Sequence, residues 1–245
     1  MFDHILSQQG PWKQARVIGD CLLLQGDCLE VMPFVGKVDA VVTDPPYGIF
    51  KKASGDGKMF GNDTIYSKDT KAAGWDHKPS SGVFDIITTM PRWVIWGGNY
   101  LCDMIGPSAG VLIWYKRTGG NSYADAEIAW TNATGTSRLF DHQWCGAFKD
   151  SERGLRAVHP TQKPVALMEW CLSFLPDAKT ILDPFAGSGS TLVACAKLGR
   201  SGIGIELDPD YYEIAVERVR KAYEQPDLFV PAPKQVLKQA DMFDE

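Results

Sequence analysis

Short apolar runs rich in β-branched and aromatic residues alternate along the chain with segments of helical periodicity. Strands that alternate with crossover helices build an open parallel sheet with helices on both faces. The pattern therefore predicts an α/β fold with a doubly wound, mostly parallel, Rossmann-like sheet. The predicted strands are residues 21–25, 39–43, 93–96, 111–115, 180–182 and 202–205, and the predicted helices are residues 28–34, 164–174, 191–198 and 210–222.

Two segments depart from this alternation. Residues 49–83 carry several glycines and lysines without periodicity, which is typical of a long functional loop or an insertion. From residue 224 onward, prolines and polar residues replace the helical pattern. A chain of 245 residues, 44% of them hydrophobic, is long enough for one large core. We predict one domain over residues 1–223 with an insertion at 49–83, and a flexible tail over residues 224–245.

The cysteines are scattered without a C-x-x-C pair, and they are Cys21, Cys28, Cys102, Cys145, Cys171 and Cys195. This spacing favours reduced, packed thiols over a disulfide framework or a zinc site. The first residues lack a basic segment followed by an apolar run, and no stretch reaches the roughly 18 apolar residues that cross a bilayer. We expect a cytoplasmic protein without a bound metal or a membrane partner.

The net charge of -5 argues against a protein that binds nucleic acid through a broad basic surface. Much of the acidity lies at residues 224–245, which contain five acids and two lysines. Residues 138–163 instead contain five lysines and arginines against three acids. A modest basic face is compatible with this distribution, although a solvated loop explains any single one of these charges.

A glycine-rich turn, Asp183-Pro184-Phe185-Ala186-Gly187-Ser188-Gly189-Ser190-Thr191, follows a predicted strand and opens a helix. Glycines in such a turn let a ligand approach the backbone, and an acid ending the next strand can accept hydrogen bonds from a ribose. Glu206 stands at that strand end. The pattern predicts a site for a dinucleotide or an adenosyl cofactor. Taken singly, Asp183 is also compatible with a buried turn former, and Glu206 with a helix cap.

The predicted strand 39–43 ends directly in Asp44-Pro45-Pro46-Tyr47. In an open α/β sheet ligands bind at the carboxyl ends of strands, so this loop should face the glycine turn. An exocyclic base amine is a weak nucleophile whose two N–H groups need two acceptors. The Asp44 carboxylate and the Pro45 carbonyl can supply them because proline restricts the backbone, and Tyr47 can stack on an extruded base. We predict that Asp44, Pro45, Pro46 and Tyr47 form a catalytic loop; a plain proline-rich turn is the alternative.

These motifs, in this order, resemble those of the DNA amino-methyltransferases of the permuted β order, in which the catalytic loop precedes the cofactor turn. The likeness is strongest to the compact enzymes of phages and prophages. The matching segments are Gly26-Asp27-Cys28, Thr43-Asp44-Pro45-Pro46-Tyr47-Gly48, Trp96-Gly97-Gly98-Asn99-Tyr100, Trp114-Tyr115-Lys116, Asp125-Ala126-Glu127-Ile128-Ala129-Trp130, His159-Pro160-Thr161-Gln162-Lys163-Pro164 and the glycine-rich turn. The resemblance implies a circularly permuted methyltransferase sheet and S-adenosyl-L-methionine as the cofactor. It also implies methyl transfer to a flipped-out base, above all adenine N6, as in restriction-modification.

The resemblance further implies roles for individual residues. Phe185, Gly187 and Gly189 would line the methionine end of the cofactor, Glu206 would hold its ribose, and Asp27 would contact its adenine. Thr161 and Lys163 would lie near the methionine carboxylate, which needs a cation or a hydroxyl donor. The complete predicted cofactor set is Asp27, Cys28, Asp44, Thr161, Lys163, Asp183, Phe185, Ala186, Gly187, Ser188, Gly189, Ser190, Thr191, Glu206 and Leu207.

One departure concerns target recognition. Larger relatives carry a long recognition segment, whereas this chain has only residues 131–158 in that place. We infer a short or relaxed recognition sequence in double-stranded DNA. The candidate DNA contacts are Lys51, Lys52, Arg138, His142 and Arg153.

The tail contains Gln239-Ala240-Asp241-Met242-Phe243 and a similar copy, Gln225-Pro226-Asp227-Leu228-Phe229. Both resemble the short peptides with which bacterial replication and repair proteins dock on the DNA sliding clamp. A role in clamp docking and a purely solubilising role are equally compatible with these residues. A homodimer is also compatible with the sequence.

Other functions stay open at this point. The first is methylation of cytosine N4, and the next is methylation of an amino group in RNA or of a protein glutamine. The order of the motifs and the aspartate that heads the loop favour DNA, and adenine somewhat over cytosine. The last alternative is a catalytically silent module that binds DNA or the clamp, against which the intact Asp44, Tyr47, Gly187 and Glu206 argue.

Overall fold

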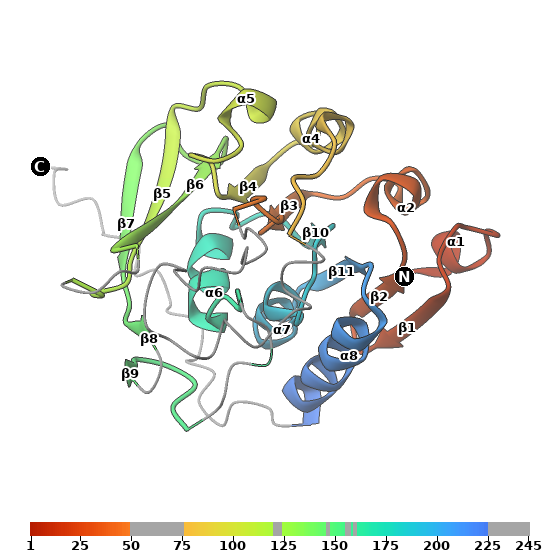
Figure 1. Ribbon diagram of the computed structural model, residues 1–245. Helices are drawn as coiled ribbons and strands as arrows, with labels where there is room; N and C mark the ends of the chain where they lie inside the picture. Colours follow the sequence, from red (N-terminus) through yellow and green to blue (C-terminus); the bar gives the residue numbers. More distant parts are fainter. Residues whose placement is uncertain (50–75, 120–123, 146–147, 155–157, 159–160, 225–245) are drawn as a thin grey trace, which may run out of the picture.

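A nine-stranded sheet in the order β1-β2-β11-β10-β3-β4-β6-β5-β7 forms the centre of the protein (Figure 1). The computed structural model describes residues 1–49, 76–119, 124–145, 148–154, 158 and 161–224. The strands of the sheet are β1 (Gln14–Ile18), β2 (Cys21–Gln25), β3 (Ala40–Thr43), β4 (Trp93–Trp96), β5 (Gly110–Tyr115), β6 (Ala126–Thr131), β7 (Ser137–Asp141), β10 (Thr180–Asp183) and β11 (Ser201–Glu206). Two shorter strands, β8 (Trp144–Cys145) and β9 (Phe148–Lys149), pair with each other outside this sheet.

Neighbouring strands from β2 to β4 run parallel, whereas β1 and β6 run antiparallel to their neighbours. The predicted mostly parallel α/β sheet is therefore confirmed. Each predicted strand is present, with ends within one residue of the prediction. These strands were predictable because β2, β3 and β4 are buried along their whole length and read as continuous apolar runs.

Helices cover both faces of the sheet (Figure 1). On one face lie α6 (Val165–Ser173), α7 (Ser190–Lys197) and α8 (Pro209–Glu224); on the other lie α1 (Asp3–Leu6), α2 (Cys28–Val35), α4 (Ser81–Thr88) and α5 (Cys102–Ile105). Successive strand residues feed the two cores in turn, with Leu23 and Val42 in the first and Leu24 and Val41 in the second. The sheet is thus the wall between two apolar layers.

The hydrophobic pattern did not predict β1, β6, β7 or the short pair β8 and β9. Strands β1 and β7 stand at the two edges of the sheet and are mostly exposed, so their side chains carry no continuous apolar signal. The segment 131–158, predicted to serve target recognition, supplies β7 to the sheet beside β5. Helix α4 begins within the segment 49–83 that was predicted to be an insertion.

The predicted boundary between a domain and a tail stays a prediction, because residues 225–245 lie outside the described part of the chain. Within the described ranges, no helix has the length and apolar character needed to cross a membrane.

The carboxyl ends of the parallel strands meet at one edge of the sheet, as in other open α/β sheets. Asp44 follows β3 there, Phe185 follows β10, and Glu206 ends β11. The Thr43 hydroxyl donates a hydrogen bond of 2.7 Å to the Asp183 carboxylate and so joins the ends of β3 and β10. Both side chains are buried, and this bond ties the catalytic loop to the glycine turn.

A Thr43→Val substitution should test this connection. The change keeps the shape of the side chain but takes a donor from a buried carboxylate, which we expect to destabilise the fold by about 1–3 kcal/mol. Urea unfolding followed by circular dichroism measures the difference. Thr136→Val, which removes an exposed hydroxyl, is the matched control and should change stability by less than about 0.5 kcal/mol. Equal stabilities for the two variants would contradict the assigned role.

Candidate active site

The glycine turn is shaped by Asp183 at the end of β10. Its carboxylate accepts a hydrogen bond of 3.1 Å from the backbone N–H of Phe185 in addition to the bond from Thr43. Burial raises the pKa of Asp183 to about 6 and outweighs these hydrogen bonds. Gly189 lies in the left-handed region at φ 79°, and a Cβ there would stand 3.0 Å from the Cβ of Ala215 on α8. A side chain at position 189 would therefore strain the turn.

Glu206 joins the turn to the neighbouring strand. One carboxylate oxygen accepts a hydrogen bond of 2.7 Å from the N–H of Gly187, and the other accepts one of 2.8 Å from the N–H of Asp208. Burial raises the pKa of Glu206 to about 7 despite these two bonds. Asp27 lies close by in the fold, because β2 pairs with β11, and its carboxylate caps α2 through the N–H of Leu29 at 2.8 Å.

Sequence reasoning missed Arg218, which supports the same turn from α8. Its guanidinium donates to the carbonyl of Ser188 at 2.6 Å and to the Ser188 hydroxyl at 2.7 Å. The other end of the guanidinium pairs with Glu152 at 3.4 Å, and Glu152 accepts the N–H of Val165 at 3.0 Å. Arg218 sits among other charged residues of α8, and nothing in that local pattern distinguishes it from a solvent-facing arginine.

The catalytic loop places Asp44 between two donors. The Tyr47 hydroxyl donates to Oδ1 of Asp44 at 2.5 Å, and the Lys163 ammonium contacts Oδ2 at 2.5 Å. The Tyr47 ring stacks on Tyr100 with a centroid distance of 5.1 Å. A Cβ on Gly97 would stand 2.1 Å from the Tyr47 ring, so glycine at position 97 leaves the space that this ring fills.

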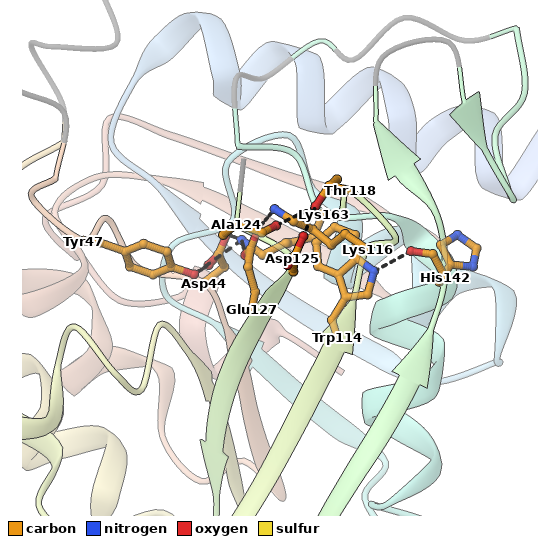
Figure 2. Close-up of polar contacts among 10 residues, drawn as sticks. All are labelled: Asp44, Tyr47, Trp114, Lys116, Thr118, Ala124, Asp125, Glu127, His142 and Lys163. Atoms are coloured by element: carbon orange, nitrogen blue, oxygen red, sulfur yellow. Dashed lines mark hydrogen bonds and ion pairs between the residues drawn. The ribbon is translucent and has the colours of Figure 1, made fainter. Parts of the chain in front are cut away.

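Lys163 belongs to a row of alternating charges that crosses the edge of the sheet (Figure 2). Its ammonium lies 3.1 Å from Oε2 of Glu127, whose Oε1 lies 2.8 Å from the ammonium of Lys116. Lys116 follows β5 and Glu127 stands near the start of the antiparallel strand β6, so both reach the edge at which β3 ends. Neither residue was predicted to belong to the site. Their positions within two quoted motifs were the only available signal.

The row sets the ionisation of its members. Burial opposes the charge on Glu127, but Lys163 and Lys116 outweigh it and hold the pKa of Glu127 at about 2. Burial also opposes the charge on Lys163, and Asp44 and Glu127 reverse this effect so that the pKa of Lys163 is raised. For Asp44 burial prevails over the attraction of Lys163 and raises the pKa. Burial and the charge of Asp44 raise the pKa of Tyr47 well above its usual value.

A pocket of about 350 Å³, its open mouth included, lies between the loop and the glycine turn. It is lined by Asp44, Thr161, Gln162, Lys163, Met168, Asp183, Phe185, Ala186, Gly187, Ser188, Ser190 and Thr191. The structure thus brings together most of the predicted cofactor residues, with Gln162 and Met168 in addition. Lys163 lines the pocket as predicted. The nearest partners of its ammonium are Asp44 and Glu127, which leaves little of its hydrogen-bonding capacity for a cofactor carboxylate.

The remaining predicted cofactor residues lie outside this lining. They are Asp27, Cys28, Gly189, Glu206 and Leu207. Cys28 is buried in α2, and burial raises the pKa of its thiol to about 12, so it is a neutral packing residue. Leu207 is 63% exposed beside Glu206. Among the described residues, no group of His, Cys, Asp and Glu side chains has an arrangement suited to a metal ion.

The candidate DNA contacts differ in their exposure to solvent. Arg138 on β7 and Arg153 are exposed, as a DNA contact requires, and Arg153 donates to the Lys149 carbonyl at 3.1 Å. His142 is only 8% exposed, lies 2.9 Å from the Ser151 hydroxyl and stacks on Phe140, so its placement is that of a packed side chain. A DNA contact of His142 therefore stays a prediction, and the structure shows its ring packed.

Several predictions concern residues outside the described ranges. Lys51 and Lys52 lie there, as do both clamp-like peptides at residues 225–229 and 239–243. Their proposed contacts with DNA and with a sliding clamp stay predictions, and so does a homodimer.

The pocket, the glycine turn with its acid, and the Asp-Pro-Pro-Tyr loop at one sheet edge define a methyltransferase type of site. The family model described as DNA methylase matches residues 103–217. The Escherichia coli (strain K12) protein YubD, which is named as a methylase, is 30% identical over 230 residues, covering 85% of this chain and 97% of YubD. The type II methyltransferase M.ScaI of Streptomyces caespitosus is 27% identical over 254 residues, which cover 82% of this chain and 81% of M.ScaI. The chain belongs to the N6/N4 DNA methylase family and is a DNA methyltransferase.

Solved structures share the fold at lower identity. The cytosine-N4-specific PvuII DNA methyltransferase matches with a TM-score of 0.53 and 16% identity, over 87% of this chain and 95% of that one. The M1.HpyAVI complex with S-adenosylmethionine matches with a TM-score of 0.51 and 23% identity, over 81% of this chain and 98% of that one. Both likenesses support the methyltransferase sheet.

Arg218→Met should loosen the glycine turn. The change removes charge-assisted hydrogen bonds to Ser188 and leaves Glu152 without this partner, and such bonds contribute about 1.5–3 kcal/mol each. We expect amide hydrogen exchange in residues 186–190 to become at least about tenfold faster. Arg220→Met is the matched control, since Arg220 forms an exposed pair with Glu217 on the same helix. Unchanged exchange in Arg218→Met would contradict the supporting role.

Proposed function

We propose that this DNA methyltransferase transfers a methyl group from S-adenosyl-L-methionine to the exocyclic amine of a base extruded from double-stranded DNA, and that the base is adenine and the atom N6. The main support for this proposal is the position of the Asp44 carboxylate, which lines the pocket beside the glycine turn and directly follows the parallel strand β3. The aspartate at the head of the loop favours adenine. Cytosine N4 is the alternative, and the PvuII enzyme is specific for that atom.

The residues of the pocket fit the proposed cofactor. When bound, S-adenosylmethionine supplies an electrophilic methyl group on a cationic sulfonium. The carboxylates of Asp44 and Asp183 favour a cation in this space, and Phe185 offers an apolar ring. Glu206 at the next strand end can accept hydrogen bonds from ribose hydroxyls. The cofactor bound in the M1.HpyAVI structure supports the same assignment.

Asp44 prepares the amine for attack. In the structure Oδ1 of Asp44 accepts the Tyr47 hydroxyl, so an incoming N–H group replaces that hydroxyl. The Pro45 carbonyl accepts the second N–H, and the lone pair of the nitrogen is directed into the pocket. Positive charge that develops on the nitrogen faces the carboxylate, and the surplus proton leaves by Asp44 after transfer. The released Tyr47 ring stacks on the base, which contributes about 1–3 kcal/mol.

Asp44→Asn should abolish most of the activity. The amide cannot accept hydrogen bonds as strongly as the carboxylate and does not compensate the developing charge, so we expect kcat to fall about 100-fold or more. Labelled methyl transfer from S-adenosylmethionine to DNA, RNA and protein, followed by nucleoside analysis, measures the rate and the product.

The same assay decides between the candidate substrates. N6-methyladenine in DNA is the expected product, and N4-methylcytosine would replace adenine by cytosine in the proposal. Label in RNA or protein alone, or full activity of Asp44→Asn, would contradict the proposed reaction. Asp85→Asn on helix α4 is the matched control, because Asp85 lies away from the pocket lining.

Cofactor binding should depend on pH through Glu206. Its pKa of about 7 means that the carboxylate ionises as the pH rises through neutrality, and the ionised form accepts ribose hydrogen bonds better. The Kd for S-adenosylmethionine should therefore decrease between about pH 6 and pH 8 and then level off. Isothermal titration calorimetry across this range measures the change.

Glu206→Gln isolates this effect from that of Asp183, whose pKa is about 6. The variant should bind more weakly and should lose the part of the pH dependence that centres near 7. An identical pH profile in the wild type and in Glu206→Gln would exclude Glu206 as the titrating group.

A further inference from the structure

The row of charges at the edge of the sheet contains two residues without an assigned task, Lys116 and Glu127. Glu127 is about one quarter exposed and Lys116 less, and Lys163 is only 6% exposed. Four charges of alternating sign follow one another in the order Lys116, Glu127, Lys163, Asp44 (Figure 2). Buried ions of this kind are costly unless each is paired, so the row is a single electrostatic unit.

Asp44 has two carboxylate oxygens, and the proposed reaction needs one of them for the base. In the structure Lys163 contacts Oδ2 at 2.5 Å, while Oδ1 faces Tyr47. The ammonium is held on that side because its other close partner is Oε2 of Glu127 at 3.1 Å. The Tyr47 hydroxyl is a more distant third neighbour at 3.4 Å. Without the pull of Glu127, the ammonium is free to move across Asp44 and to occupy both of its oxygens.

We propose that Glu127 is a positioning residue of the methyl transfer: it confines Lys163 to one oxygen of Asp44 and leaves the other oxygen for the amine of the base. Lys116 holds Glu127 in turn through Oε1 at 2.8 Å and acts only through it. This inference rests on the proposed function, because it assigns a task to residues next to the amine-accepting carboxylate.

The arrangement of the strands supports the roles proposed for Glu127 and Lys116. Glu127 is anchored in β6, which pairs with β4 on one side and with β5 on the other. Lys116 follows directly on β5, and its N–H donates to the carbonyl of Asp125 at 2.8 Å. Beyond it the Thr118 hydroxyl donates to the carbonyl of Ala124 at 3.0 Å, which closes the connection from β5 to β6 (Figure 2). The pair of Lys116 and Glu127 is therefore held by the hydrogen-bonded strands β5 and β6, beside Lys163.

Glu127→Gln tests the proposal with little change of shape. We expect kcat to fall about 100-fold, the loss typical of a misplaced reacting group, while the KM for S-adenosylmethionine changes less than threefold. Lys116→Met should lower kcat in the same way. The double variant Lys116→Met/Glu127→Gln should be no slower than Glu127→Gln alone, because Lys116 acts through Glu127.

The pH profile separates positioning from a general structural defect. Among the described residues, the titratable groups that act on Lys163 or Asp44 include Glu127, Tyr47 and Asp183, and Lys116 pairs with Glu127. The charge on Glu127 raises the pKa of both Asp44 and Lys163. Its removal should therefore move the acidic and the alkaline limb of the kcat profile together to lower pH.

A measurement without turnover accompanies the kinetics. In protein labelled with ¹³C-lysine, the Cε resonance of Lys163, assigned by its absence from Lys163→Met, should titrate at lower pH in Glu127→Gln than in the wild type. This readout tests the control of Lys163 by Glu127 independently of turnover. A wild type that methylates no DNA would overturn the proposed function, whereas an unshifted Lys163 titration would overturn the positioning role of Glu127.

Glu169→Gln is the matched control, because Glu169 pairs with Lys197 at 3.1 Å between α6 and α7. It should leave kcat, the pH profile and the Lys163 titration unchanged. Wild-type kcat in Glu127→Gln, an unshifted Lys163 titration, or losses that multiply in the double variant would each overturn the proposal. If Glu127→Gln does not fold, the kinetics and the Lys163 titration of Lys116→Met decide the question.

Discussion

The contact between the Lys163 ammonium and the Asp44 carboxylate is the interaction on which the site depends. The two residues lie 119 positions apart, and the lysine side chain is only 6% exposed. An isolated ion in such surroundings carries a desolvation cost of several kcal/mol, and the pairing of the two groups offsets part of this cost. The loop after β3 and the segment before α6 therefore meet at this pair. The pocket between them and the glycine turn is a consequence of this meeting.

The same contact belongs to a network in which the polar groups of the loop pair with one another. A buried polar group needs a partner, and the groups assigned to the base satisfy one another in the structure. Tyr47 donates to the oxygen that we assign to the base amine, and its ring stacks on Tyr100 and fills the space left by Gly97. A flipped base therefore exchanges one set of contacts for a similar one. Exchange of this kind keeps a polar site stable in both states.

The sequence predicted the parallel part of the sheet well for a physical reason. Strands such as β2 and β4 are buried on both faces, so the first and last residue of each apolar run mark the ends of the strand. Turn residues follow these runs directly. The ends of parallel strands share an edge. The loop that begins at Asp44 and the turn that begins 139 residues later, at Asp183, could therefore be expected to face one another. The structure places both in one pocket.

The charged support of the site was not predictable in the same way. Glu127 reaches Lys163 only because the antiparallel strand β6 lies between β4 and β5, and its half-buried residues gave no strand signal. Arg218 stands in an amphipathic helix whose sequence shows charges but not which of them face inward. The packing of His142 was likewise not predictable, because its ring lies against Phe140, a contact that depends on β7 joining the sheet.

Strand β7 takes up part of the segment 131–158, for which target recognition stays a prediction. Part of the short segment 131–158 belongs to the sheet, since Ser137–Asp141 pairs with β5 along its whole length. Later in that segment Glu152 accepts the N–H of Val165 and pairs with Arg218, which holds the glycine turn. Val165 follows two residues after Lys163. A displacement of Glu152 by bound DNA would thus act on both the cofactor turn and the segment that carries Lys163. The predicted recognition segment therefore contributes at least one residue, Glu152, that supports the glycine turn.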